Sequence, residues 1–374
     1  IKFAAVLDSR LMSRCLELLT CYAKDPRHTS RACSGWRCLV AKRCQDVLPY
    51  AGQIHAEFAP LLHPSSGTSS INQRLLCETL GILCSRMDEE TQHVSLRAVL
   101  QPLLYPLGAA EDTAAVGGAI QAVASFLGGL DEMANPDLPE WPELLTCIQA
   151  AALRCPAEPE VGAALSSLGW SPIAELPPGL LLPFFTSVWS RVVRDDLHWN
   201  LASKLLRAHR GAEAEQFASV AIVASAQASS LEDMEPSSWA SFTDCALRAA
   251  RLYPRSVTWG DPALGKLMLG AFEGRVRPTD LLHAVQAWTL LIDAGLKPPV
   301  QLAGHLVTSA QQMDRVDIDG RAVVAEVCRC LFFLCRQRDL QESAVEAFAL
   351  VRGASVEALV AMALQPSAEN FCSE

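Results

Sequence analysis

The feature that most constrains the fold is an apolar stripe of helical period that stops and restarts along the chain. Between residues 278 and 299, apolar side chains recur at three- and four-residue steps and fall on one face of a helix. Pro278 and Thr279-Asp280 are start signals, Gly295 is an end signal, and Pro298-Pro299 prevents continuation. The pattern predicts one amphipathic helix between two short breaks.

The same pattern recurs along the chain and predicts an all-α fold. Aromatic residues make up 6% of the chain while Ala and Leu are abundant, which favours closely packed helices over sheets. We find no convincing alternating strand pattern. Helices are expected near residues 4–24, 36–48, 50–62, 70–87, 91–105, 113–130, 140–154, 158–168, 179–193, 196–209, 212–230, 236–252, 261–272, 279–294, 299–312, 320–337, 340–351 and 354–365.

The regular succession of helices predicts an α-solenoid. Helices joined by short loops would form antiparallel pairs that repeat about every 40 residues, the size of HEAT or armadillo units. A compact helical domain would need one central core and more variable helix lengths. Because the predicted helices are evenly amphipathic, the sequence favours the repeating array over the compact domain. We expect one continuous solenoid over residues 1–374, with soft boundaries near 63–70, 155–160 and 229–238. The chain starts at Ile1, so we interpret it as a piece of a longer protein or as a sequence whose beginning is missing.

Charge and cysteine content narrow the functional class. A net charge of −10 argues against nucleic-acid binding by the whole surface, although the first segment is basic and a local basic face stays open. The fourteen Cys lie mostly within apolar helical patterns, which favours reduced, buried thiols in a cytosolic or nuclear protein. No segment has the length and apolar character of a membrane span. The glycine pairs 117–118 and 128–129 are candidate hinges or close helix contacts.

Two stretches resemble ligand-binding loops without fulfilling their chemistry. Gly260 to Leu267 has the glycine and lysine spacing of a phosphate loop, but Leu267 replaces the magnesium-binding hydroxyl and Pro262 removes a backbone donor. Asp261-Pro262 is instead expected to begin a helix. Residues 315–326 follow part of a calcium-loop pattern, but Arg315 stands at the first ligand position and Glu326 is expected inside a helix.

No arrangement of side chains predicts catalysis or metal binding. Cys328, Cys330 and Cys335 lack the Cys-x₂-Cys spacing of zinc sites, so structural thiols are favoured. The run Asp195-Asp196-Leu197-His198 places two carboxylates beside an imidazole but is expected to cap a helix. We therefore predict no catalytic residue, cofactor-binding residue, metal ligand or cofactor, and no enzyme.

Several stretches carry a resemblance to a known family. These are Trp36 to Lys42 leading to Leu61-Leu62, the run Arg74-Leu-Leu-Cys-Glu-Thr-Leu-Gly-Ile-Leu83, and residues 99–104 and 119–130. They resemble successive helices in the tRNA-exportin branch of the karyopherin-β family of nuclear import and export receptors. The stretch from Phe242 to Gly295 is similar to the transportin-3 and importin-13 branch, in which counterparts of six residues occur in similar order: Arg248, Pro254, Val285, Leu291, Ile292 and Gly295.

This resemblance implies a non-enzymatic transport receptor. Such a receptor would wrap tRNA or protein cargo over an extended surface under the control of a Ran-type GTPase, and it would move between nucleus and cytoplasm. The repeats that grip the GTPase in that family would precede this chain, so no site residue is carried over from the family.

Two other functions stay open. Weak repeats rich in Ala and Leu also suit an architectural subunit of a large assembly, such as an organellar ribosome or a respiratory complex, in which case the protein would lie in the mitochondrion. The other alternative is an organellar RNA-binding repeat protein, a class that usually needs a basic concave face and base-reading side chains in each repeat.

Overall fold

The chain is all-helical wherever the computed structural model describes it. The described residues are 9–63, 66–109, 112–130, 138, 140–193, 197–231, 234–273, 276–313, 318–336 and 341–352. Every regular element in these ranges is an α-helix or a 3-10 helix, which confirms the all-α part of the prediction. The helix predicted at 354–365 lies outside the described residues.

The chain divides into two compact units, Ile1–Asp195 and Asp196–Glu374. This division coincides with none of the three soft boundaries expected from the sequence. A single continuous solenoid over the whole chain stays a prediction. The two units are described separately below.

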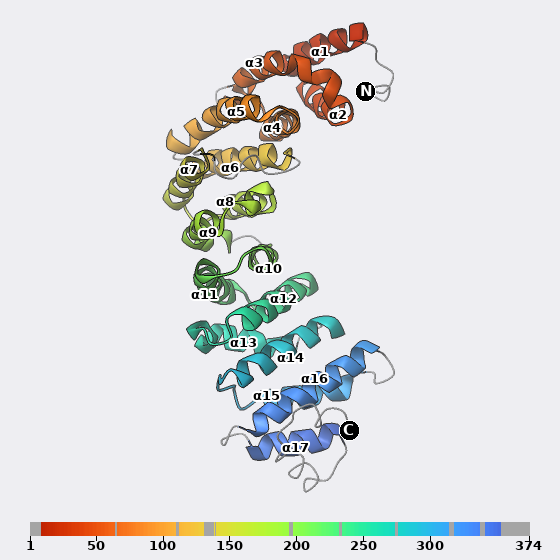
Figure 1. Ribbon diagram of the computed structural model, residues 1–374, viewed down its shortest axis with the longest axis vertical. Coiled ribbons are helices and arrows are strands. Elements are labelled where there is room, and N and C mark those ends of the chain that lie inside the picture. Colours follow the sequence, from red (N-terminus) through yellow and green to blue (C-terminus); the bar gives the residue numbers. More distant parts are fainter. Residues whose placement is uncertain are drawn as a thin grey trace. The chain divides into compact units, whose positions relative to one another are not determined.

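The first unit consists of helices that pack on their second neighbours (Figure 1). One layer stacks α2, α4, α6 and α8 in turn, and the other stacks α3, α5, α7 and α9, while α1 packs on α2. The elements are α1 (Ser9–Lys24), α2 (Thr29–Val47), η2 (Leu48–Tyr50), α3 (Ala51–Leu62), α4 (Ser70–Cys84), α5 (Glu89–Ala109), α6 (Thr113–Gly128), α7 (Glu140–Arg154), α8 (Pro159–Trp170), η4 (Pro172–Glu175) and α9 (Pro178–Val192).

The second unit repeats this packing (Figure 1). Helices α10, α12, α14 and α16 stack in turn, α11 packs on α13, and α15 packs on α17. The elements are α10 (His198–Ala208), α11 (Ala212–Ala228), α12 (Pro236–Leu252), η5 (Val257–Gly260), α13 (Pro262–Gly270), α14 (Pro278–Asp293), α15 (Leu302–Gln312), α16 (Ile318–Cys335) and α17 (Gln341–Arg352).

Large buried side chains lie on helices of both layers in each unit. Trp36 of α2 contacts Phe58 of α3 edge to face, with ring centroids 5.3 Å apart. In the second unit, Trp199 of α10 contacts Phe242 of α12 at 4.9 Å. Helix α12 is buried on most of its circumference and leaves one narrow stripe open to solvent. The apolar stripes of the sequence are therefore the surfaces that hold neighbouring helices together.

Helix α2 begins earlier than the sequence predicts. The expected start was residue 36, whereas the helix begins at Thr29. Its first two turns bury Ala32, Cys33 and Gly35, which are too small to produce a visible apolar stripe.

None of the helices that the structure describes combines the length and the apolar character needed to cross a membrane.

Candidate functional site

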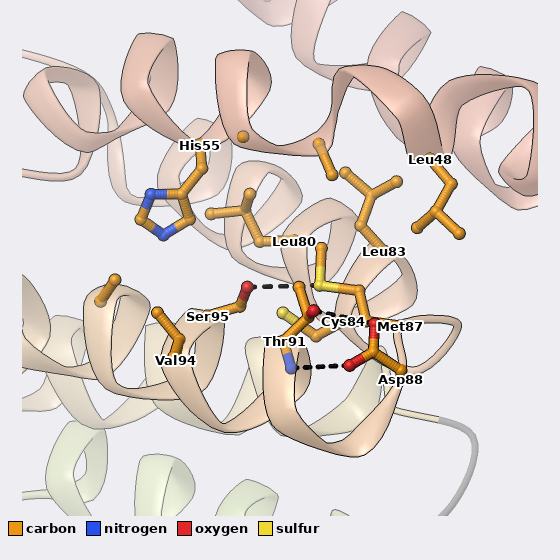
Figure 2. Close-up of a pocket in the computed structure, with 13 residues that line it drawn as sticks. Leu48, His55, Leu80, Leu83, Cys84, Met87, Asp88, Thr91, Val94 and Ser95 are labelled. Atoms are coloured by element: carbon orange, nitrogen blue, oxygen red, sulfur yellow. Dashed lines mark hydrogen bonds between the residues drawn. The ribbon is translucent and has the colours of Figure 1, made fainter.

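A cavity of about 470 Å³ lies between η2, α3, α4 and α5 of the first unit (Figure 2). Most of its lining is aliphatic or thioether in character, because the helices turn apolar residues toward one another here. The lining residues are Leu48, Ala51, Gly52, His55, Leu80, Leu83, Cys84, Met87, Asp88, Thr91, Val94, Ser95 and Ala98.

The polar groups at the α5 end of the cavity already bond to one another. Asp88 caps α5, since its Oδ1 accepts the Thr91 amide at 3.0 Å and its Oδ2 accepts the Thr91 hydroxyl at 2.8 Å. The Ser95 hydroxyl donates to the Met87 sulfur at 3.2 Å. This carboxylate therefore serves the start of a helix.

His55 lies at the opposite end of the cavity from Asp88 (Figure 2). Burial lowers the pKa of His55, and its Nε2 is buried without a hydrogen-bond partner. Burial also raises the pKa of the Cys84 thiol to about 12, so this sulfur is no nucleophile near neutral pH. The cavity thus offers a mainly apolar surface, and its lining residues contain no assembled acid–base pair.

A second candidate surface is the solvent-facing stripe of α10 and α12 in the second unit. Asp244 on α12 accepts hydrogen bonds from the Ser203 hydroxyl of α10 and from Arg248 Nε, the latter at 2.8 Å. Arg207 Nη2 of α10 lies 3.6 Å from the same Asp244 oxygen. We call Lys204, Arg207, Arg248 and Arg251 the basic stripe.

The charges of this stripe stabilise the Asp244 carboxylate. Partial burial raises its pKa, but the hydrogen bonds from Arg248 and Ser203 and the charges of Arg248 and Arg207 outweigh burial, so the pKa lies below its usual range. Between α12 and the next helix of the stack, Arg251 Nη2 of α12 donates to Gln286 Oε1 of α14 at 3.3 Å. These contacts join successive helices and fix the direction of the guanidinium groups.

The phosphate-loop look-alike is a helix start, as the sequence predicts. Asp261 is the N-cap of α13, and its Oδ1 accepts the amides of Ala263 at 2.9 Å and Leu264 at 3.1 Å. Pro262 occupies the first turn. The backbone amides that would cradle a phosphate are therefore already used.

The other stretches singled out in the sequence fall partly outside the described residues. Asp319 lies in the first turn of α16 and Glu326 lies within that helix, while Arg315 and Asp317 lie outside the described residues. His198 lies at the start of α10, and Asp195-Asp196 also lie outside the described residues. Within the described ranges, no group of three or more His, Cys, Asp or Glu side chains is arranged to hold a metal ion.

The cysteines of the described helices are free thiols, and many are buried. Burial raises the pKa of both Cys77 and Cys330 to about 12. Cys328, Cys330 and Cys335 lie on the buried surface of α16. They contribute to the core as small apolar groups.

Comparison of the chain with known protein families and with curated proteins finds no match. The residues that carry the resemblance to karyopherins can nevertheless be located. Val285, Leu291 and Ile292 are core residues of α14, and Gly295 ends that helix with φ of +100°. Arg248, in contrast, lies on the basic stripe.

Sequence reasoning missed both the cavity and the basic stripe. Each is assembled from different helices, and Ser203 and Asp244 are 41 positions apart. The only local signal was the spacing of Asp244, Arg248 and Arg251 on one helical face.

Proposed function

We propose that this chain is part of an α-solenoid that binds macromolecular partners, as a nuclear transport receptor of the karyopherin-β type does. The observation that supports this proposal is the stacking of most helices on their second neighbours within each unit. Such stacking leaves one solvent-facing stripe per helix and aligns these stripes side by side, which suits binding energy spread over an extended surface.

The chemistry of the described side chains supports binding. The Asp88 carboxylate caps a helix, the Asp244 carboxylate is held by arginines, and the buried thiols have raised pKa values. The cargo would be protein or tRNA, with release controlled by a Ran-type GTPase. Small rotations between stacked helices would change the curvature of the binding surface.

Affinity capture from cell extract tests the proposal. The protein is tagged at its own locus, so that any flanking sequence is retained, and captured in the presence of Ran-type GTPase locked with GTP or with GDP. We expect the bound cargo to change with the nucleotide, and tRNA enriched with GTP would identify an exporter. A constant set of ribosomal or respiratory subunits would reject the receptor and favour an architectural role.

A further inference from the structure

Helix α1 has two apolar sides, one of which is open to solvent. Its buried side packs on α2 and, with fewer contacts, on α3 (Figure 1). On the other side Leu11, Leu18 and Tyr22 expose 55%, 40% and 46% of their surface. Cys15 is partly buried between them in the helix sequence. We call these four residues the outer stripe.

The spacing of the outer stripe fits a helical partner. Its members recur at steps of four, three and four residues, so they follow one side of α1 for about three turns, roughly 16 Å. Apolar side chains in such a row can interdigitate with those of a second amphipathic helix laid along them. A continuous row of this kind indicates an interaction surface, whereas single exposed apolar residues do not.

Arg14 borders the outer stripe on α1. It is three residues from Leu11 and four from Leu18, so its side chain starts next to both on the helix surface. Arg14 Nη1 lies 2.7 Å from Glu17 Oε2, and both side chains of this pair are mostly exposed. Exposed ion pairs contribute little to stability, so Arg14 can turn to a carboxylate of a partner at small cost.

More positive charge lies at the Tyr22 end of the outer stripe. The Tyr22 ring contacts His28 edge to face, with ring centroids 5.3 Å apart. Arg27, the neighbour of His28, is held by the Asp25 carboxylate at 3.0 and 3.2 Å, and Arg31 is exposed one turn beyond His28. The wider region has the same sign, because residues 1–87 contain eleven Lys and Arg but six Asp and Glu. Their net charge is +5 in a chain whose net charge is −10.

These features distinguish between three kinds of partner. A second copy of the chain, paired through the same stripe, would bring Arg14 and Arg31 close to their own counterparts, and like charges repel. Single-stranded RNA binds on aromatic rings against which its bases stack, whereas Leu11 and Leu18 offer no such ring. An acidic amphipathic helix satisfies both the apolar row and the cations beside it.

We propose that the outer stripe is a docking surface for an acidic amphipathic helix of a partner protein. The apolar side of that helix covers Leu11, Leu18 and Tyr22, and its flanking Asp and Glu side chains face Arg14 and Arg31. This inference deepens the proposed function, since it names the chemistry of one partner, and it rests on that function only in taking the chain to be a binding protein.

Fluorescence anisotropy with the whole purified chain tests this site. The probe is a labelled helical peptide with Leu along one side and Glu on both flanks of that side. The comparison probes are a scrambled peptide of the same composition, whose Leu residues no longer share one side, and a single-stranded RNA of equal charge. Light scattering on the chain without any probe measures its oligomeric state.

Two double variants remove the two kinds of contact separately, and each has a matched control. L11A/L18A shortens the outer stripe, and its control I71A/L350A removes two exposed aliphatic side chains from α4 and α17. R14Q/R31Q removes two cations, and its control R74Q/R321Q removes two exposed arginines from α4 and α16. All substituted side chains are exposed or mostly exposed, so we expect the variants to fold, and circular dichroism checks this.

We expect the Leu–Glu peptide to bind the wild-type chain and to bind L11A/L18A at least about tenfold more weakly, with I71A/L350A within about twofold of wild type. R14Q/R31Q should weaken binding about threefold at low salt and less at high salt, and R74Q/R321Q should not weaken it. The scrambled peptide and the RNA should bind more weakly than the Leu–Glu peptide.

Several results would overturn the proposal. These are no binding of the Leu–Glu peptide, equal binding of the scrambled peptide, equal affinities of folded L11A/L18A and I71A/L350A, and tighter binding of the RNA. A wild-type dimer that L11A/L18A converts to a monomer would also overturn it, because a second copy would then cover the stripe. No GTPase is present, so this experiment and the capture experiment can fail independently.

Discussion

At the scale of single residues, Gly81 and Gly129 determine how closely α4 and α6 approach. A Cβ built on Gly81 would lie 2.0 Å from the Phe126 carbonyl oxygen, and one built on Gly129 would lie 2.4 Å from the Glu78 carbonyl oxygen. Both obstacles are backbone atoms of the facing helix, which cannot turn aside as a side chain can.

We expect Gly81→Ala to lower the free energy of unfolding by about 1–3 kcal/mol, because the two helices must separate. The matched control is Gly118→Ala on α6, where nothing lies within 4 Å of the added Cβ. That variant should be neutral or up to about 1 kcal/mol more stable, since Ala is the better helix former. Urea titrations of both proteins provide the measurement, and equal stability would show that α4 and α6 can move apart freely.

The same glycines show what a sequence cannot decide at this scale. The pairs 117–118 and 128–129 are predicted as hinges or close contacts, yet Gly129 is tightly enclosed whereas Gly118 and Gly128 face open space. Whether a glycine is enclosed depends on whether the backbone of another helix passes close to it. For Gly129 that backbone belongs to α4, far away along the chain, and the local pattern carries no information about it.

Asp244 makes stability depend on pH. Its pKa is lower in the folded chain than in the unfolded chain, so its contribution is complete above the unfolded pKa and is lost as the pH falls through the folded pKa. We expect the wild-type chain to lose stability between about pH 5 and pH 3, and Asp244→Asn to remove part of that loss. Urea unfolding across this range measures it, with Asp293→Asn, at the end of α14, as the charge-matched control. Parallel pH profiles for the wild-type chain and Asp244→Asn would contradict the assignment.

At the scale of elements, helix α13 depends on its first residue. Asp261→Ala removes the acceptor for two backbone amides, those of Ala263 and Leu264. We expect a loss of about 1 kcal/mol in the free energy of unfolding. Asp261→Ser keeps a capping oxygen and should retain most of that stability. If Ala and Ser behave alike, the cap contributes nothing and the helix is held by packing alone.

Most elements could be predicted because their signals are local. The 278–299 stretch forms α14 at Pro278–Asp293, and Asp261-Pro262 begins α13. The early turns of α2 could not be predicted, because Ala32 and Gly35 are buried without a large apolar side chain. The pairing of helices was also beyond the sequence, since Ser203 and Asp244 meet only after α10 and α12 stack.

At the scale of the whole molecule, the stacking of most helices on their second neighbours implies that stability is local. A helix in such an array contacts mainly its neighbours, so a disturbance should fade within a few helices. Neither candidate surface could therefore be predicted from one segment. The cavity needs α3, α4 and α5 together, and the basic stripe needs α10 and α12.

Hydrogen exchange followed by mass spectrometry can test this locality. We expect Gly81→Ala to speed exchange in α4 and α6, and in the adjoining α2 and α8, while α12 and α14 exchange as in wild type. Asp261→Ala should instead raise the exchange rate in α13 and α11 and leave the exchange rate in α4 and α6 unchanged. Each variant is the control for the other, because a substitution in one unit should leave hydrogen exchange in the other unit unchanged. If either variant raised exchange throughout both units, the chain would unfold as one cooperative body. Binding at one surface could then influence a distant surface through the stability of the whole chain instead of through neighbouring helices.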